Sequence, residues 1–263
     1  MALWHTPWRL GAAALVCAAA LATAAAAAPA PPATATVMLR GHAQDVRLYG
    51  TRGGPPVIVS SGDGGWMHLG PRVAELLAAR GFFVVGFDAR AYLETFTSGS
   101  STLRPADEPL DYRALIDFAA RGASERPILV GVSEGAGLSV LAAADPAVKP
   151  LIRGVVTLGL PDRNELGWRW KDAIIYVTHG VPNEPTFRAR DVLSNVAPVP
   201  LAAIHSTQDE FVPLIEARDV FAHAAQPARF WVVPARDHKF SGNLEGFEAN
   251  LMEALAWIEH SAA

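Results

Sequence analysis

The sequence predicts an α/β fold in which a mostly parallel central sheet carries helices on both faces. Apolar segments rich in β-branched residues alternate with segments of helical spacing along residues 36–263. The apolar segments are continuous, which is typical of strands that are covered on both faces. The chain has 263 residues, of which 51% are hydrophobic, so it can bury a sizeable core without a metal or a disulfide.

Each predicted strand is a short run of β-branched, aromatic and aliphatic residues. Turn residues separate the runs, as the Gly-Gly-Pro-Pro segment at 53–56 does. In chain order we expect strands at residues 36–40, 45–49, 57–60, 82–87, 128–132, 151–160, 201–205 and 229–233.

Each predicted helix has apolar residues at a spacing of three and four. The first has a proline at its start, Pro71, and a glycine at its end, Gly81, which are the usual positions of these residues. We expect helices at residues 70–80, 109–121, 135–144, 212–224 and 244–259.

The first 35 residues have the layout of a secretory signal. A start that carries Arg9 precedes an Ala-rich apolar run, and small residues at alternate positions follow it. We therefore expect a signal peptide at 1–28, an Ala/Pro-rich linker at 29–35, and an exported domain at 36–263 that is periplasmic or secreted. An uncleaved membrane anchor is the alternative, but the alanine-rich run favours cleavage.

Composition and motifs exclude several classes of protein. Twenty-two basic and 26 acidic residues give a net charge of −4, which argues against a nucleic-acid partner. The single cysteine, Cys17, lies in the signal segment, so the mature domain has no cysteine nucleophile, Fe–S cluster or Cys-ligated zinc. Neither a nucleotide-binding glycine motif nor H-E-x-x-H occurs. We expect no cofactor, no metal and a monomer.

Residues 161–200 interrupt the alternation of strands and helices. This stretch holds several prolines together with Trp168 and Trp170, and long irregular segments of this kind are often lids or binding loops. We therefore expect a lid-like insertion here. Because ligands bind at the carboxyl ends of parallel strands, chemistry is expected just after the strands.

The segment Gly131-Val132-Ser133-Glu134-Gly135 is a G-x-S-x-G pattern that follows a predicted strand and opens a predicted helix. That context is typical of a nucleophile elbow, in which the serine is held on a strained turn and the flanking glycines avoid a clash. Ser133 is therefore the candidate nucleophile. A glycine-rich turn without chemistry is the alternative.

A base has to remove the Ser133 proton before the oxygen can attack. His238 follows the last predicted strand directly, at the carboxyl edge of the sheet, and is the candidate base. His179, in the 161–200 region, is the alternative. The other downstream histidines are expected in a strand core, in a helix and at the chain end: His205, His223 and His260.

The acid that orients the base is expected at another strand end. Asp209 follows the strand at 201–205 and precedes His238 by one strand, in the order nucleophile, acid, base. Asp162 is the alternative acid, and a helix N-cap is the alternative role for Asp209. Asp237 is adjacent to His238 and cannot readily fold back onto it.

An oxyanion hole needs two backbone N–H groups. The first is expected from Glu134, the residue after the nucleophile. The second is expected from Asp63 or Gly64, in the glycine-rich loop that follows the strand at 57–60.

These residues resemble the α/β-hydrolase superfamily over about residues 36–260. The matching features are the elbow around Ser133, Asp209 with Val212-Pro213, and His238. More narrowly, S-S-G-D-G-G-W at 60–66 resembles the S-G-D-G-G-W signature of the bacterial virulence protein family typified by VirJ and the carboxyl-terminal domain of AcvB. The segments V-V-G-F-D at 84–88 and D-H-K-F at 237–240 are similar too.

The resemblance implies export to the periplasm and hydrolysis of an aminoacylated phospholipid, specifically lysyl-phosphatidylglycerol. We therefore expect a serine hydrolase that cleaves a small-molecule or lipid ester through Ser133, Asp209 and His238, with peripheral contact to membrane lipid. A non-catalytic envelope or export-associated binding module on the same fold is one alternative, and a serine peptidase is another. Carboxylates at Asp63 and Glu134 suit a cationic lysyl group, although Glu134 can equally serve only its helix end.

Overall fold

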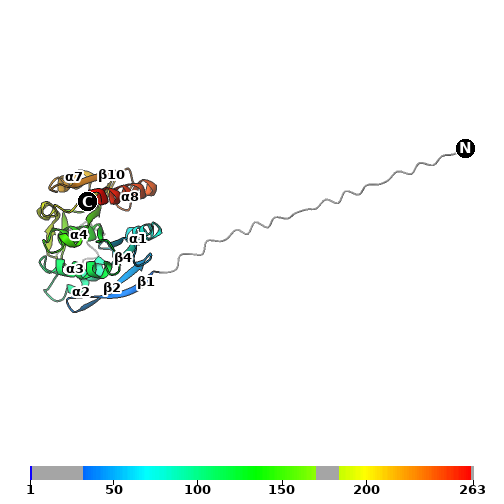
Figure 1. The fold of residues 1–263 in the computed structure, drawn as a ribbon. Coiled ribbons are helices and arrows are strands. Elements are labelled where there is room, and N and C mark those ends of the chain that lie inside the picture. The colour runs from blue at the N-terminus through cyan, green and yellow to red at the C-terminus, as the bar shows by residue number, and fades with distance from the viewer. Residues whose placement is uncertain (2–31, 170–183, 262–263) are drawn as a thin grey trace. The chain divides into compact units, whose positions relative to one another are not determined.

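The computed structural model describes Met1 and residues 32–169 and 184–261 (Figure 1). The predicted signal peptide, the linker up to Pro31, and His179 fall outside the described residues. Those expectations therefore stay predictions.

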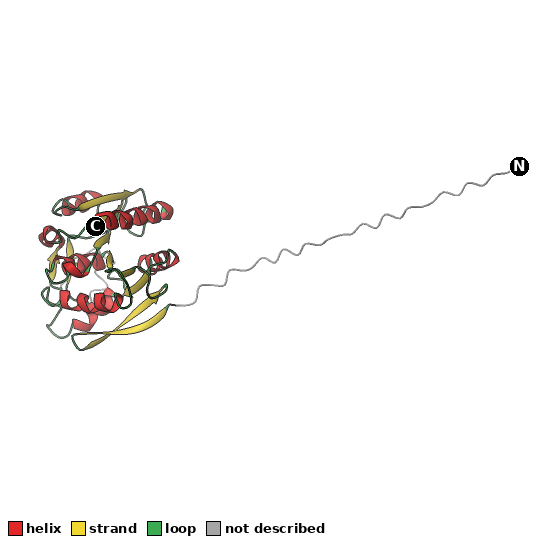
Figure 2. Cartoon of the chain, in the orientation of Figure 1, coloured by secondary structure: helices red, strands yellow, loops and turns green. Residues whose placement is uncertain are grey.

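An eight-stranded sheet forms the centre of residues 32–261, in the order β1-β2-β4-β3-β5-β6-β9-β10 (Figure 2). The β1–β2 and β2–β4 pairs are antiparallel, and the remaining pairs are parallel. The predicted fold class is thus confirmed. The strands are β1 (Ala33–Leu39), β2 (His42–Tyr49), β3 (Pro56–Ser60), β4 (Phe83–Phe87), β5 (Ile128–Val132), β6 (Gly154–Leu158), β9 (Leu201–Ser206) and β10 (Ala228–Val233).

Helices cover both faces of this sheet, with one apolar core on each. Helices α1 (Leu69–Ala79) and α8 (Leu244–Ser261) bury their apolar residues in one core. The core on the other face takes residues of α2 (Ala89–Phe96), α3 (Glu108–Ala119), α4 (Glu134–Ala144) and α7 (Leu214–Phe221). Successive strand residues alternate between the two cores: Ile58 joins this second core, whereas Val57 and Val59 join the first.

The structure differs from the expected boundaries mainly at the sheet edge. Strands β1 and β2 begin at Ala33 and His42, three residues earlier than expected, because these outer strands alternate buried and exposed residues instead of being continuously apolar. Helix α2 was not predicted from the sequence. Its start is capped by Asp88, whose Oδ1 accepts the N–H of Ala91 at 3.1 Å.

Two expected elements are shorter in the structure. The strand expected at 151–160 is β6, and a 3₁₀ turn, Lys149–Leu151, precedes it. The helix expected at 212–224 is α7, which begins only after Pro213.

The described parts of the 161–200 region contain short elements. Strands β7 (Arg163–Glu165) and β8 (Thr186–Arg188) form a separate antiparallel pair, and α6 (Ala189–Val192) follows. Residues 170–183 lie outside the description, so the lid stays a prediction. Within the described ranges, no helix has the length and apolar character needed to cross a membrane, and no group of three or more His, Cys, Asp or Glu residues could hold a metal ion.

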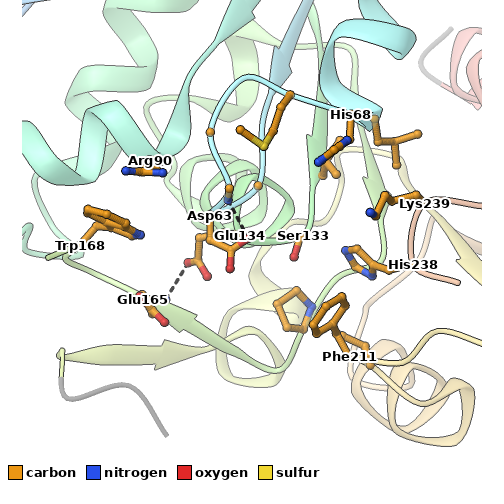
Figure 3. A pocket seen from close by; sticks show the side chains of 18 of the residues that line it. Asp63, His68, Arg90, Ser133, Glu134, Glu165, Trp168, Phe211, His238 and Lys239 are labelled. Atoms are coloured by element: carbon orange, nitrogen blue, oxygen red, sulfur yellow. Dashed lines mark hydrogen bonds between the residues drawn. The ribbon is translucent and has the colours of Figure 1, made fainter. Parts of the chain in front are cut away.

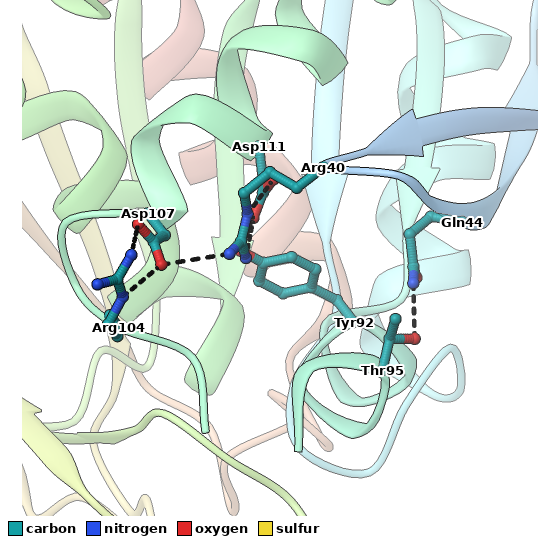
Figure 4. Close-up of polar contacts among 7 residues, drawn as sticks. All are labelled: Arg40, Gln44, Tyr92, Thr95, Arg104, Asp107 and Asp111. Atoms are coloured by element: carbon teal, nitrogen blue, oxygen red, sulfur yellow. Dashed lines mark hydrogen bonds and ion pairs between the residues drawn. The ribbon is translucent and has the colours of Figure 1, made fainter. Parts of the chain in front are cut away.

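A partly buried ion pair ties the β1–β2 turn to helices α2 and α3 (Figure 4). The Arg40 guanidinium donates to both Asp111 oxygens, at 2.7 to 3.0 Å, and the Tyr92 hydroxyl donates to Asp111 Oδ2 at 2.7 Å. Asp107 accepts a longer bond from Arg40, at 3.3 Å, and is held mainly by the exposed Arg104. Asp111 is fully buried, and Arg40 is the cation that pairs with it.

Arg40→Met is expected to lower the free energy of unfolding by about 2 kcal/mol, because the Asp111 carboxylate stays buried without its cation. Urea denaturation at neutral pH measures the loss. Arg104→Met is the matched control and is expected to change little, since that side chain is 77% exposed. Equal losses in the two variants would contradict the role given to Arg40.

Candidate functional site

Ser133 lies on a strained turn between β5 and α4. Its backbone φ is 50° and ψ is −117°, a conformation that a residue other than glycine rarely adopts. Its N–H donates to Leu158 O on β6 at 2.9 Å, which holds the turn against the sheet. The side chain lines a pocket at the carboxyl edge of the sheet, as expected for a nucleophile elbow.

The glycines of the G-x-S-x-G pattern are required by close backbone contacts. A Cβ on Gly131 would lie 2.2 Å from Gly135 O, and a Cβ on Gly135 would lie 2.3 Å from Ser61 O. Helix α4 can therefore begin directly against β5 and the loop after β3 only if both positions lack side chains.

His238 and Asp209 are joined by a short hydrogen bond. The distance between His238 Nδ1 and Asp209 Oδ2 is 2.6 Å, and both side chains are about nine-tenths buried or more. His238 follows β10 and Asp209 follows β9, so the two loops meet at the same edge of the sheet. Asp209 Oδ1 accepts the N–H groups of Phe211 and Val212, at 3.0 and 2.8 Å.

Each partner shifts the pKa of the other. Burial lowers the pKa of His238, but the hydrogen bond and charge of Asp209, aided by the charges of Asp63 and Glu210, raise it further than burial lowers it. Burial raises the pKa of Asp209, and the opposing interactions with His238 and the Val212 amide bring it below its usual value.

His238 Nε2 is buried and has no hydrogen-bond partner among the described residues. Ser133 and His238 both face the same pocket (Figure 3), but no hydrogen bond joins them in the described part of the chain. Such bonds are often long in proteins without substrate and shorten when a substrate binds.

Two residues that sequence reasoning did not single out hold the imidazole in position. A Cβ on Gly159, after β6, would lie 2.4 Å from His238 Cε1, so the ring packs directly on that backbone. The Phe211 ring meets the imidazole edge-on, with centroids 5.5 Å apart. A glycine at a strand end was the only sequence signal for Gly159.

The alternative residues lie elsewhere or have other partners. Asp162 is bound by Arg188 and Arg190, at 2.7 to 3.0 Å, and does not contact His238. His205 is buried in β9, as expected for a core histidine. His223 and His260 bond backbone carbonyls of their own helical segments, and Asp237 accepts backbone N–H groups of Lys239 and Ser241. Asp209 Oδ1 accepts the amides of Phe211 and Val212, which lie ahead of α7, so Asp209 does not cap that helix.

The loop that carries Asp63 is anchored at both ends. Ser61 Oγ accepts the Ala89 N–H at 3.1 Å. The Trp66 backbone N–H donates to Asp88 Oδ2, and its indole packs where a side chain on Gly86 would be, since a Cβ there would lie 2.4 Å from the ring. The middle of the loop lies against Ser133: a Cβ on Gly62 would be 3.3 Å from Ser133 Cβ.

A cavity of about 540 Å³ opens in front of Ser133. On one side of Ser133 lie Glu134 and Glu165, with Trp168 and Arg90 beyond them, and on the other side lie His238, His68 and Lys239 (Figure 3). Burial, and then the neighbouring charges of Glu165 and Asp63, hold the pKa of Glu134 well above its usual range. Burial also raises the pKa of Asp63, although the Gly64 amide and His238 oppose the shift.

Glu134 has a defined partner in the pocket wall. Its Oε1 accepts the backbone N–H of Glu165 at 2.6 Å, so the side chain fastens β7 to the start of α4. The same residue therefore supports the pocket wall and contributes a carboxyl group to the pocket. No motif or spacing in the sequence pointed to Glu165 as its neighbour.

The sheet order, the elbow and the positions of Asp209 and His238 after β9 and β10 define a protein of the α/β-hydrolase fold. Solved structures with this fold match across the described chain. Residues 56–173 also match the model of the family described as bacterial virulence protein (VirJ). The resemblance seen in the residue 60–66 segment is thus confirmed over that stretch, which includes Ser133 but ends before Asp209 and His238.

Three solved structures illustrate the fold match. The α/β-hydrolase GrgF from Penicillium sp. sh18 has a TM-score of 0.65 at 13% identity, covering 89% of this chain and 99% of that one. Est1E from Butyrivibrio proteoclasticus has a TM-score of 0.62 at 17% identity, and the match covers 85% of this chain and 99% of that one. The esterase domain of a Rhodothermus marinus protein has a TM-score of 0.59 at 19% identity, and the match covers 88% of this chain and 99% of that one. No curated protein sequence matches the chain.

Proposed function

We propose that this protein is an exported serine hydrolase that cleaves a carboxylic ester. The observation that carries the proposal is the Asp209–His238 hydrogen bond, at 2.6 Å, beside a pocket into which Ser133 faces from a strained turn. The fold neighbour from Rhodothermus marinus, which is named as an esterase domain, supports the same class of reaction.

In the proposed reaction, Ser133 Oγ attacks the ester carbonyl while His238 Nε2 takes its proton. The tetrahedral intermediate collapses to an acyl-enzyme, and the same imidazole returns the proton to the leaving alcohol. Water, deprotonated by His238, then releases the acid and regenerates Ser133. Asp209 holds the imidazole with a proton on Nδ1, which leaves Nε2 free to accept.

The negative oxygen of the intermediate is proposed to receive N–H groups from Glu134 and Asp63. The Glu134 amide is the first of helix α4, where the helix dipole favours negative charge. The Gly64 N–H already donates to Asp63 Oδ1 at 2.9 Å, and this favours Asp63 over Gly64 as the second donor.

The substrate class that the pocket suits best is an aminoacyl ester of an anionic lipid, such as lysyl-phosphatidylglycerol. Three carboxyl groups, those of Asp63, Glu134 and Glu165, line the acyl side, and an ammonium group there offsets their mutual repulsion. Lys239, on the other side of Ser133, suits a phosphate on the leaving alcohol.

Export and lipid contact belong to the same proposal. The segment at 1–28 would direct the monomeric protein to the periplasm or the exterior. Met67 and Phe211 line the pocket and are 50% and 53% exposed, and apolar side chains at a pocket opening suit peripheral contact with lipid.

A fluorophosphonate probe tests the reaction class, because it forms a covalent bond only with an activated serine. We expect labelling of the folded protein at Ser133, located by peptide mass analysis. Folded protein that remains unlabelled would favour the non-catalytic binding module. Turnover of amide substrates at rates similar to the matching esters would favour the peptidase.

Glu134→Gln is expected to reduce the preference for a lysyl ester over its neutral norleucyl analogue by about tenfold, or roughly 1.4 kcal/mol. The amide oxygen can still accept the Glu165 N–H, so the fold is kept. The ratio of kcat/KM values for the two esters measures the effect.

Glu216→Gln is the matched control for this variant. It makes the same carboxyl-to-amide change at an exposed position on α7 that does not line the pocket. A preference that changes equally in both variants would show that net charge, and not the pocket carboxyl, selects the substrate.

A further inference from the structure

His205 contacts the loop that carries the acid, although it lies outside the pocket. It is the penultimate residue of β9, it is 2% exposed, and its ring stacks on Phe230 of β10 with centroids 6.2 Å apart. Its Nε2 lies 2.8 Å from Val212 O and 3.7 Å from Asp209 Oδ2. The reaction scheme above does not use this buried ring.

The contact with Val212 determines which ring nitrogen carries the proton. A carbonyl oxygen can only accept a hydrogen bond, so His205 Nε2 must be the donor. Burial lowers the pKa of His205 by more than the Val212 carbonyl and the Asp209 charge raise it. The ring is therefore neutral near pH 7. A neutral imidazole with its proton on Nε2 fits this position.

The backbone carbonyl and the backbone N–H of Val212 are both hydrogen-bonded. Its carbonyl accepts from His205, and its N–H donates to Asp209 Oδ1 at 2.8 Å. Asp209 Oδ1 is thereby fixed on the backbone of its own loop, which leaves Oδ2 directed at His238 Nδ1, at 2.6 Å. The contacts form one chain from His205 through Val212 and Asp209 to His238.

We propose that His205 is a positioning residue, which holds the Val212 backbone so that Asp209 presents Oδ2 to His238. Its effect on catalysis rests on the proposed function, but its effect on the His238 ring does not. His205 touches neither the pocket nor a reacting atom.

The test compares His205→Leu, which has no donor, with His205→Gln, whose side-chain amide can donate to Val212 O. The first readout is the NMR titration of His238 in isotope-labelled protein. The charged and titratable groups that act on this ring are Asp209, Asp63, Glu210 and His205. We expect the His238 midpoint to fall by about one pH unit in the leucine variant and to stay near the wild-type value in the glutamine variant.

The second readout is hydrolysis of a p-nitrophenyl ester. We expect kcat to fall by about tenfold or more in His205→Leu with KM unchanged, and His205→Gln to recover most of the loss. Should the leucine variant fail to fold, His205→Asn replaces it, because that side chain is too short to reach Val212 O.

The proposal would be overturned if the His238 titration midpoint were unchanged in His205→Leu. It would also be overturned if His205→Gln shifted that midpoint and lowered kcat as much as His205→Leu does. Absence of ester hydrolysis in the wild-type protein would refute the proposed function alone, since the titration of His238 still decides the role of His205.

Discussion

Ser133→Ala is expected to reduce ester hydrolysis at least about 10³-fold and to abolish fluorophosphonate labelling. The variant removes the only atom that can form the acyl-enzyme in the proposed reaction. The fold should survive, because Ser133 Oγ makes no hydrogen bond to any of the described residues and the strained backbone is set by neighbouring glycines. Steady-state kinetics and thermal unfolding of the same preparation measure the two effects.

Ser139→Ala is the matched control for this experiment. It deletes the same atom six residues further along α4, where the hydroxyl donates to Gly135 O at 2.7 Å and does not face the pocket. We expect labelling and turnover within a few-fold of wild type. Turnover that persists in Ser133→Ala would remove the basis of the proposed function.

Asp209→Asn is expected to lower kcat by about 10⁴-fold while leaving the fold intact. The asparagine oxygen can still accept the Val212 N–H, but the amide nitrogen now faces His238 Nδ1 and presents a donor to a donor. The imidazole then favours the tautomer with its proton on Nε2, which cannot take the Ser133 proton.

The pH profile gives an independent check on this variant. His238 has to be neutral to accept a proton, so kcat/KM is lost as pH falls through its pKa. In the wild-type protein that pKa is raised, which places the acid limb above the ordinary value of about 6.5. Asp209→Asn removes the main raising interactions and leaves burial, so the limb of the residual activity should move to lower pH.

Glu210→Gln is the control for Asp209→Asn. The Glu210 Oε2 accepts the backbone N–H of His238 at 2.8 Å, and glutamine keeps an acceptor there. We expect kcat within a few-fold of wild type and only a small shift of the acid limb. A loss as large as that of Asp209→Asn would indicate that loop charge, and not imidazole orientation, supports activity.

The central strands could be predicted from the sequence because they are buried on both sides. In β3, β5 and β6 every residue is buried, and continuous apolar runs mark such strands clearly. The outer strands β1 and β2 are partly exposed and carry polar residues, so their starts were set three residues late. Helix α2 was missed because its eight residues are too few for a clear periodic pattern.

The residues of the candidate site could be predicted because each one follows a strand and the three occur in the expected chain order. Ser133, Asp209 and His238 each follow a strand; Ser133 and His238 line the same pocket, and Asp209 is hydrogen-bonded to His238. The contacts that support them could not be predicted in this way. The packing of Trp66 on Gly86, for example, joins residues 20 apart through three-dimensional contact alone.

The packing of His238 on Gly159 has a consequence for how the protein tolerates sequence change. Gly159 has a backbone φ of +63°, and any side chain there would displace the imidazole. In a saturation-mutagenesis library screened for turnover, we therefore expect substitutions of Gly159 to be as harmful as substitutions of Ser133 or His238, although Gly159 contributes no reactive atom. Redesign of the pocket for bulkier acyl groups has to begin from other walls.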